Sequence, residues 1–195
     1  MRFLLLGISL FMIVSCNESV QTEKKAVIKS SHSSAFNQSV STMLNDYYAL
    51  SEAFVNWDSL AVKEKSSLMD KDLKQVNLKE FEKDSVRLKE ANFRMYQVQD
   101  HIFGIITQNE ITSQRRQFDS LSQALYAFLN TVEYDQEKIY QQKCPMAFND
   151  SETATWLTNR GKDSIRNPYL GKKHPKYGSG MLECGENQSI LDFQK

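Results

Sequence analysis

The sequence predicts a mainly α protein, an antiparallel four-helix bundle with a loop-rich C-terminal cap that can include a short β-hairpin. Apolar residues recur at helical spacing through four consecutive segments between Phe36 and Val132. Short connections join these segments, which favours antiparallel packing of sequence neighbours. Beyond about Gln142 the composition changes, because all three prolines and five of the seven glycines lie there. Regular helix is therefore expected to stop at that point.

Each predicted helix carries its own apolar stripe. The first helix begins at Phe36, and a second, shorter one follows the capping sequence Trp57-Asp58-Ser59 and ends near Gln75. The third runs from about Lys79 to Thr107, and the fourth follows Gln108-Asn109. The stripes consist of Phe36, Val40, Met43, Tyr47, Leu50 and Phe54, then Leu60, Ala61, Leu68, Met69 and Leu73, then Phe81, Leu88, Ala91, Met95, Val98, Ile102 and Ile105, and finally Ile111, Phe118, Leu121, Leu125, Phe128 and Val132.

Residues 36–195 are predicted to form one domain, of which residues 143–186 are the cap. Short strands are expected around Ile139–Gln141 and Met181–Glu183, with turns at the Asn-Pro, His-Pro and Gly-Ser-Gly sequences. A long segment with little regular structure is usually functional or covalently stapled. We expect its shape to depend on Trp156, Asn167, Tyr169 and Gly171.

The N-terminus predicts an exported protein. Arg2 precedes an apolar run from Phe3 to Val14, which is typical of a signal peptide over residues 1–15. The run is shorter than the roughly 20 residues that a helix needs to cross a bilayer. Ile13-Val14-Ser15-Cys16 resembles the bacterial lipobox, which implies lipidation of Cys16 and a location in the cell envelope, on the periplasmic side or at the outer membrane. The alternative is an ordinary secretory signal with an incidental cysteine, although the usual Ala-x-Ala cleavage pattern is absent.

The composition predicts how the chain meets its surroundings. Residues 16–35 are polar and rich in Ser and Lys, so they are expected to form a flexible tether in which His32 is solvated. The 24 basic residues balance the 24 acidic ones, and a nucleic-acid partner would require a basic surface. The predicted partner is therefore the membrane, through the N-terminal lipid, and not nucleic acid.

Several motifs, in order, resemble one bacterial family. They are Gln114–Ser122, Cys144-Pro145-Met146, Ile165–Gly171 and Met181–Gly185. Together they resemble an uncharacterised envelope domain of unknown function, found in lipoproteins and fused to the periplasmic adaptor subunits of heavy-metal efflux pumps of the resistance-nodulation-division type. The resemblance covers most of residues 40–186 and implies an envelope metal-efflux system as a partner. His101 matches the family's helical histidine, whereas many members have histidine where this chain has Gln117.

Sulfur-bearing residues occur in two of these motifs. Cys144 and Met146 lie two residues apart in one motif, and Met181 and Cys184 lie three apart in the other. Thiolate and thioether ligands favour soft metals, and Cu(I) is the natural candidate. The sequence therefore predicts a copper site formed by these four residues, with His101 as a further ligand, in a protein of metal homeostasis or efflux.

A disulfide between Cys144 and Cys184 is the alternative to a metal site. These two are the only cysteines besides Cys16, and an oxidising compartment permits them to pair. In the chain-entropy model, closing this loop contributes about 3–4 kcal/mol. The chain would then be a non-catalytic interaction or structural module, with Met146 and Met181 as packing residues. The sequence favours neither alternative.

Catalysis is not predicted. The chain has no Gly-x-Ser-x-Gly elbow, phosphate loop or His-Glu-x-x-His zinc helix, and a nucleophile pair of Cys144 and His101 would have no orienting acid. Arg115 and Arg116 are expected to form ion pairs. The acidic residues Glu133, Asp135 and Glu137 are expected to form a solvated helix end.

Overall fold

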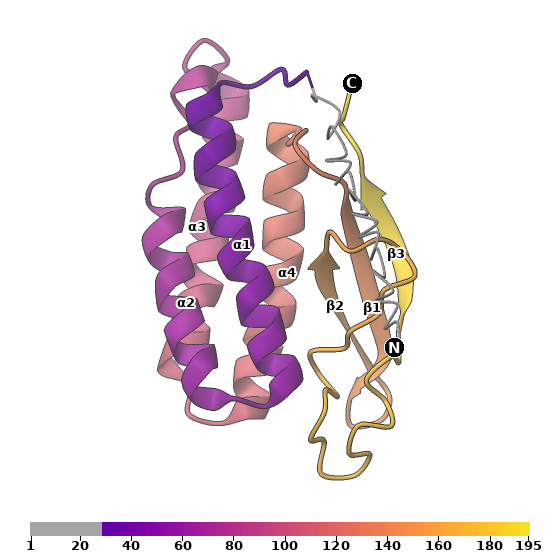
Figure 1. Cartoon of the computed structure of the whole chain (residues 1–195). Coiled ribbons are helices and arrows are strands. Elements are labelled where there is room, and N and C mark those ends of the chain that lie inside the picture. The colour runs from indigo at the N-terminus through magenta and orange to yellow at the C-terminus, as the bar shows by residue number, and fades with distance from the viewer. Residues whose placement is uncertain (1–28) are drawn as a thin grey trace, which may run out of the picture.

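The computed structural model describes residues 29–195 (Figure 1). Four helices form an antiparallel bundle, and a three-stranded antiparallel sheet follows them, so the predicted mainly α class is confirmed. The signal segment, Cys16 and most of the predicted tether lie outside the described residues. The elements are α1 (Ser34–Asn56), α2 (Ser59–Leu73), a 3₁₀ turn (Lys79–Phe81), α3 (Ser85–Thr107), α4 (Ile111–Val132), β1 (Ile139–Phe148), β2 (Glu152–Thr158) and β3 (Glu186–Leu191).

Side-chain caps set where three of the helices begin. Ser33 accepts a hydrogen bond from the backbone N–H of Phe36, and Asp58 and Asp84 make the same kind of bond at the start of α2 and α3. The Asp84 cap explains why the third helix begins at Ser85, six residues after the predicted start at Lys79. The intervening residues form only a short 3₁₀ turn.

The sheet differs from the predicted strands. Its order is β2-β1-β3, with both pairs antiparallel. The strand expected near Ile139 is confirmed and continues to Phe148, whereas Met181–Glu183 is a turn and the third strand lies at Glu186–Leu191. The expected strand fails because local turn bonds, including the one from Cys184 N to the Met181 carbonyl, satisfy that backbone. The β2 strand was not predicted: its last five residues are all buried, so it lacks the alternation of a half-buried strand.

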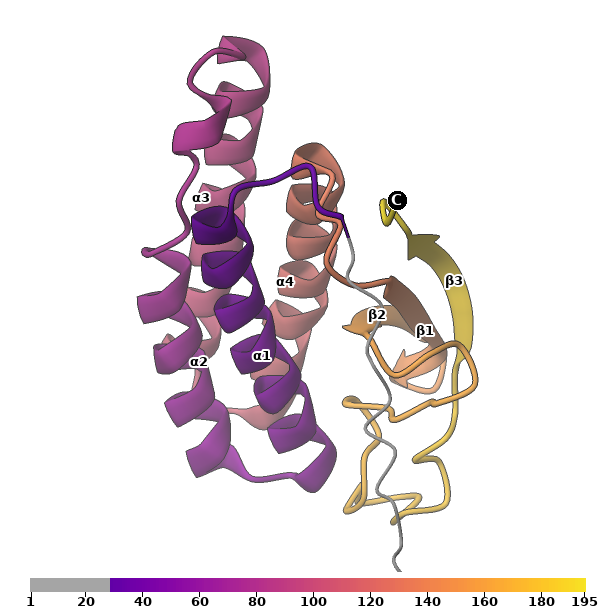
Figure 2. The same ribbon diagram turned by 45° about the horizontal axis from the view of Figure 1, so that its top comes forward.

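The sheet packs against α4 and α1, while α3 packs on α4 and α2 on the side away from the sheet (Figures 1 and 2). One apolar core runs from Phe36 to Leu191 and includes the side chains of Trp156 and Tyr169. Between residues 29 and 195, no helix is both long enough and apolar enough to cross a membrane.

The free edge of β2 is satisfied by side chains. Thr155 N donates to Asp119 Oδ1 at 2.7 Å, and Leu157 N donates to the Tyr47 hydroxyl at 2.9 Å. The Tyr169 hydroxyl donates to the Thr155 carbonyl. The bundle is thus hydrogen-bonded to the sheet edge, which would otherwise present unpaired backbone groups.

The chain before α1 lies against the bundle from Ser30 onward. Asp135 accepts hydrogen bonds from the Ser30 hydroxyl and from Ser31 N, each at 2.7 Å. The His32 side chain is only 6% exposed and lies 2.5 Å from Glu80. The predictions that His32 and Asp135 are solvated are therefore wrong, because residues 30–33 and the end of α4 cover one another.

Candidate functional site at a buried thiol pair

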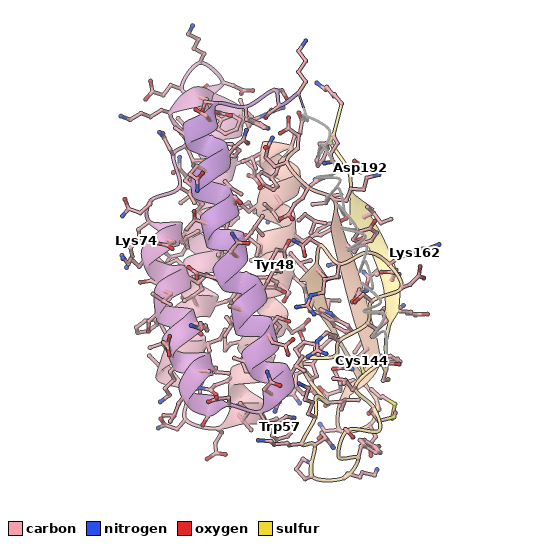
Figure 3. The ribbon with its side chains drawn as sticks, viewed as in Figure 1. Tyr48, Trp57, Lys74, Cys144, Lys162 and Asp192 are labelled. Atoms are coloured by element: carbon pink, nitrogen blue, oxygen red, sulfur yellow. The ribbon has the colours of Figure 1, made fainter. Side chains whose placement is uncertain are left out.

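Two cysteines that are 40 residues apart in sequence meet beside the sheet. The Sγ atoms of Cys144, on β1, and Cys184, in the loop before β3, lie 3.7 Å apart. Both thiols are free; Cys144 is fully buried and Cys184 is partly exposed. Figure 3 places Cys144 in the part of the sheet that lies toward the Trp57 end of the bundle.

The pairing of β1 with its two neighbouring strands explains why the segment before β3 lies close to Cys144. Cys144 pairs with Ala154 of β2, and β1 is paired with β3 only as far as Lys143 and Glu186. Cys184 lies two residues before the start of that pairing. The chain that leads into β3 therefore passes beside Cys144, which brings the two sulfur atoms together.

Asn167 and Gly185 hold the Cys184 loop in place. Asn167 is fully buried; its Nδ2 donates to the Cys184 carbonyl at 2.7 Å and its backbone N–H donates to the Leu182 carbonyl at 2.8 Å. Gly185 is packed so closely that a Cβ there would lie 2.7 Å from the Trp156 ring. The prediction that Asn167 shapes the cap is confirmed. The sequence analysis does not predict a role for Gly185. The pattern that could have indicated one is a glycine directly after a candidate ligand, where close packing of the backbone can require it.

The Cys184 thiol keeps its proton at neutral pH. Burial, together with the neighbouring Cys144 sulfur, raises the pKa of Cys184 to about 11. Two thiolates in contact would repel each other, so loss of both protons requires either a cation between the sulfur atoms or a covalent bond. The arrangement therefore suits capture of a soft cation or oxidation to a disulfide.

The two candidate thioethers come from the same segments as the thiols. Met146 follows Cys144 on β1, and the carbonyl of Met181 accepts a hydrogen bond from Cys184 N at 3.1 Å. Both methionines are partly buried against the core. The structure thus brings the two thiols together and places both methionines in the same chain segments as the thiols.

His101 does not lie in these two segments. It lies on α3, and its Nδ1 is 3.2 Å from Oε1 of Gln117 on α4. Helix α4 stands between α3 and the sheet (Figure 1). Within residues 29–195, no three His, Cys, Asp or Glu side chains are grouped to hold a metal. His101 is therefore not placed with the thiol pair, whose own candidate donor atoms are sulfur. That composition fits Cu(I) better than Zn²⁺, which usually takes four N, O or S ligands.

The two arginines at the start of α4 differ from each other. Arg116 forms the predicted ion pair, with Glu152 at 2.7 Å. Arg115 is buried and donates to the carbonyls of Phe54 and Pro168, both at 2.9 Å, and its guanidinium lies 3.8 Å from the centre of a Trp57 ring. Burial lowers the pKa of Arg115 to about 9. The ion-pair prediction is wrong for Arg115, which instead joins the end of α1 to the cap.

These features define a small helical bundle joined to an antiparallel sheet, with a buried thiol pair beside the sheet. Residues 43–137 match the family described as "Protein of unknown function (DUF3347)". The matched range ends before β1 and therefore does not reach Cys144 or Cys184. No curated protein and no solved structure matches the chain.

Proposed function

We propose that this protein binds Cu(I) between Cys144 and Cys184 and serves metal homeostasis or efflux in the cell envelope. The observation that carries the proposal is the 3.7 Å separation of the two Sγ atoms. Two thiolates on one tetrahedral Zn²⁺ ion, each about 2.3 Å from it, are about 3.8 Å apart, whereas disulfide sulfur atoms are about 2.0 Å apart. The pair therefore has nearly the spacing of two ligands on one ion.

The surroundings of the pair support a soft monovalent ion. Cys144 is fully buried, and burial of charge is costly unless opposite charges meet. A cation bound by two thiolates offsets their mutual repulsion. It also replaces the proton that Cys184 otherwise keeps at neutral pH because its pKa is raised. Met146 and Met181 supply thioethers, which are uncharged and add no further repulsion.

The envelope location rests on the N-terminal sequence. Cys16 ends a lipobox-like sequence, which supports a lipid anchor in a membrane of the cell envelope. The resemblance to domains fused to efflux adaptors supports a metal-efflux system as the partner. In this proposal the protein is a metal carrier and not an enzyme.

A second candidate function follows from the same geometry. Sulfur atoms at 3.7 Å require only a small movement to form a disulfide, and the proposed compartment is oxidising. The bond would fix the loop before β3 to β1 and would make the chain an interaction module without a metal.

Titration of the reduced full chain with Cu(I) against a competing chelator tests the metal site. We expect one Cu(I) per chain, with binding lost in Cys184→Ser and Cys144→Ser and weakened roughly 10-fold or more in Met146→Ala and Met181→Ala. Met95→Ala and His101→Ala are the controls, and both should bind as the wild type does. Wild-type affinity in the two cysteine variants would contradict the proposal.

Thiol counting separates the two candidates. Protein taken from its native compartment and unfolded with a Cu(I) chelator, but without a reductant, should present two alkylatable thiols, at Cys144 and Cys184, if it carries metal. Blocked thiols that appear only after reduction would favour the disulfide module.

A further inference from the structure

Helix α3 carries apolar residues on two opposite faces. Its inner face, which includes Val98, Ile102 and Ile105, lies in the core. Its outer face is open to solvent, and the apolar residues there are large. Their exposed fractions are 78% for Val86, 51% for Phe93, 67% for Tyr96 and 64% for Phe103. In residues 29–195, this one face holds four of the seven exposed large hydrophobic residues, so they are gathered and not scattered.

The outer face has a seven-residue repeat. Val86, Phe93 and Asp100 are spaced seven apart, and Lys89, Tyr96 and Phe103 form a second series three residues further on. All six are exposed. Alternating steps of three and four define the a and d positions of a coiled coil, in which one helix packs along another. We call these six positions the seam. From Val86 to Phe103 the seam is about 26 Å long.

The repeat matches itself when one copy is reversed. In an antiparallel helix pair centred between residues 94 and 95, each a position of one copy opposes a d position of the other. Val86 then opposes Phe103, Phe93 opposes Tyr96, and Lys89 opposes Asp100. Because the pairing is symmetric, each of these contacts forms twice. Aromatic residues occupy the centre, where the residues that dominate an interface are usually found.

The two charged residues of the seam lack a partner of opposite charge. None of the salt bridges in residues 29–195 involves Lys89 or Asp100. They are about 16 Å apart along one helix, too far to reach each other within a chain. In the antiparallel pair, each faces the opposite charge of the other copy.

A groove borders the same face. It lies between α2 and α3, has a volume of about 260 Å³, and is lined by residues that include Lys74, Tyr96 and Phe103. It continues the apolar seam toward α2 and gives large side chains of a second helix room to pack.

We propose that the outer face of α3 binds the same face of a second copy of this chain, antiparallel, to form a homodimer. The inference is independent of the proposed copper site. The sheet and the thiol pair lie beyond α4, on the opposite side of the molecule (Figure 2), so dimerisation leaves both thiol pairs uncovered.

A charge-swap experiment tests both the dimer and its register. The protein is studied by sedimentation equilibrium in a mild detergent that covers the N-terminal lipid or, where the signal segment is retained, the apolar run from Phe3 to Val14. The wild type should dimerise, and Lys89→Asp or Asp100→Lys alone should weaken association at least ~10-fold, because like charges then face each other twice. The double variant K89D/D100K should regain wild-type association, which no contact within one chain can explain.

Two further variants distinguish the interface from a general effect on folding. Phe93→Ser should be monomeric with an unchanged circular dichroism spectrum. Leu60→Ser, which alters an 82% exposed leucine on α2 outside the seam, should dimerise as the wild type does. The proposal would be overturned by a wild-type protein that stays monomeric at all concentrations. Binding of this face to vesicles or to a different protein, without self-association, would overturn it as well. So would a double variant that fails to regain association.

Discussion

Asp46 shows how one side chain makes stability depend on pH. Burial and the neighbouring Asp72 carboxylate raise the pKa of Asp46 to about 6, and its Oδ2 is buried without a hydrogen-bond partner among the described residues. The ordinary pKa of an aspartate is about 3.9. Because the folded state binds this proton more tightly than the unfolded state does, the stabilising effect is present below about pH 4 and is lost as the pH rises through 6.

The substitution Asp46→Asn should therefore stabilise the protein at pH 7.5, because it removes a carboxylate that must ionise beside Asp72. The gain in the free energy of unfolding should shrink toward zero at pH 4, where the wild-type side chain keeps its proton in the folded state. Urea unfolding at the two pH values measures both quantities. A variant that is less stable than the wild type at pH 7.5 would show that this account of Asp46 is wrong.

Arg115 and Arg116 provide a matched pair of test positions. Arg115→Lys should destabilise the protein by about 1–3 kcal/mol, since an ammonium group cannot replace the planar guanidinium that bonds two carbonyls and stacks on Trp57. Arg116→Lys at the exposed ion pair should cost less than about 0.5 kcal/mol. Denaturant unfolding of both variants makes the comparison, and equal losses would argue against the structural role of Arg115.

At the residue scale, helical spacing separates these two arginines. Arg115 lies four residues after Ile111 and three before Phe118, on the apolar face of α4, whereas Arg116 lies off that face. His32 and Asp135 carry no such local signal, because each is covered by a segment roughly 100 residues away in the chain.

At the scale of secondary-structure elements, Tyr47 links three of them. From α1, its hydroxyl oxygen accepts a hydrogen bond from Leu157 N of β2 and lies 2.7 Å from Ser122 Oγ of α4. Tyr47→Phe would leave the buried Leu157 N–H without a partner, at a cost of about 1–3 kcal/mol. Tyr48→Phe should cost less, because Tyr48 bonds the partly exposed Glu137. Thermal unfolding measures the loss of stability in each variant. An equal loss in Tyr47→Phe and Tyr48→Phe would contradict the proposed link.

The helices were predictable and the strands were only partly so. Helical stripes such as the one from Phe36 to Phe54 are local patterns, and burial against neighbouring helices preserves them. β2 is buried along most of its length, and β3 is mostly exposed apart from Leu191, so neither has the alternating pattern of a half-buried strand. The end of the cap therefore could not be placed from periodicity.

At the scale of the whole molecule, the DUF3347 match and the folded core have different limits. The match ends at residue 137, yet Trp156, Tyr169 and Leu170 are fully buried in the core that begins at Phe36. A chain that ends at residue 137 should therefore lose cooperative thermal unfolding, since α4 and α1 would expose the surfaces that the sheet covers. Circular dichroism melting compares it with the full chain, and a cooperative transition at the same midpoint would contradict a shared core.

The candidate residues could be named from the sequence, but their arrangement could not. Cys144, Met146, Met181 and Cys184 could be named because soft sulfur ligands are rare and occur in two short motifs. The meeting of the two thiols depends on the register of β1 and β3, and the exclusion of His101 depends on which helices face the sheet. Both are long-range properties that local patterns do not carry.

The most direct test of the copper proposal is X-ray absorption at the copper K-edge on the full chain loaded with one Cu(I). The account predicts that only sulfur atoms surround the metal, at least two of them, and that Cys184→Ser removes this signal. A shell of nitrogen or oxygen atoms, or a spectrum unchanged by loss of the Cys184 thiol, would contradict it.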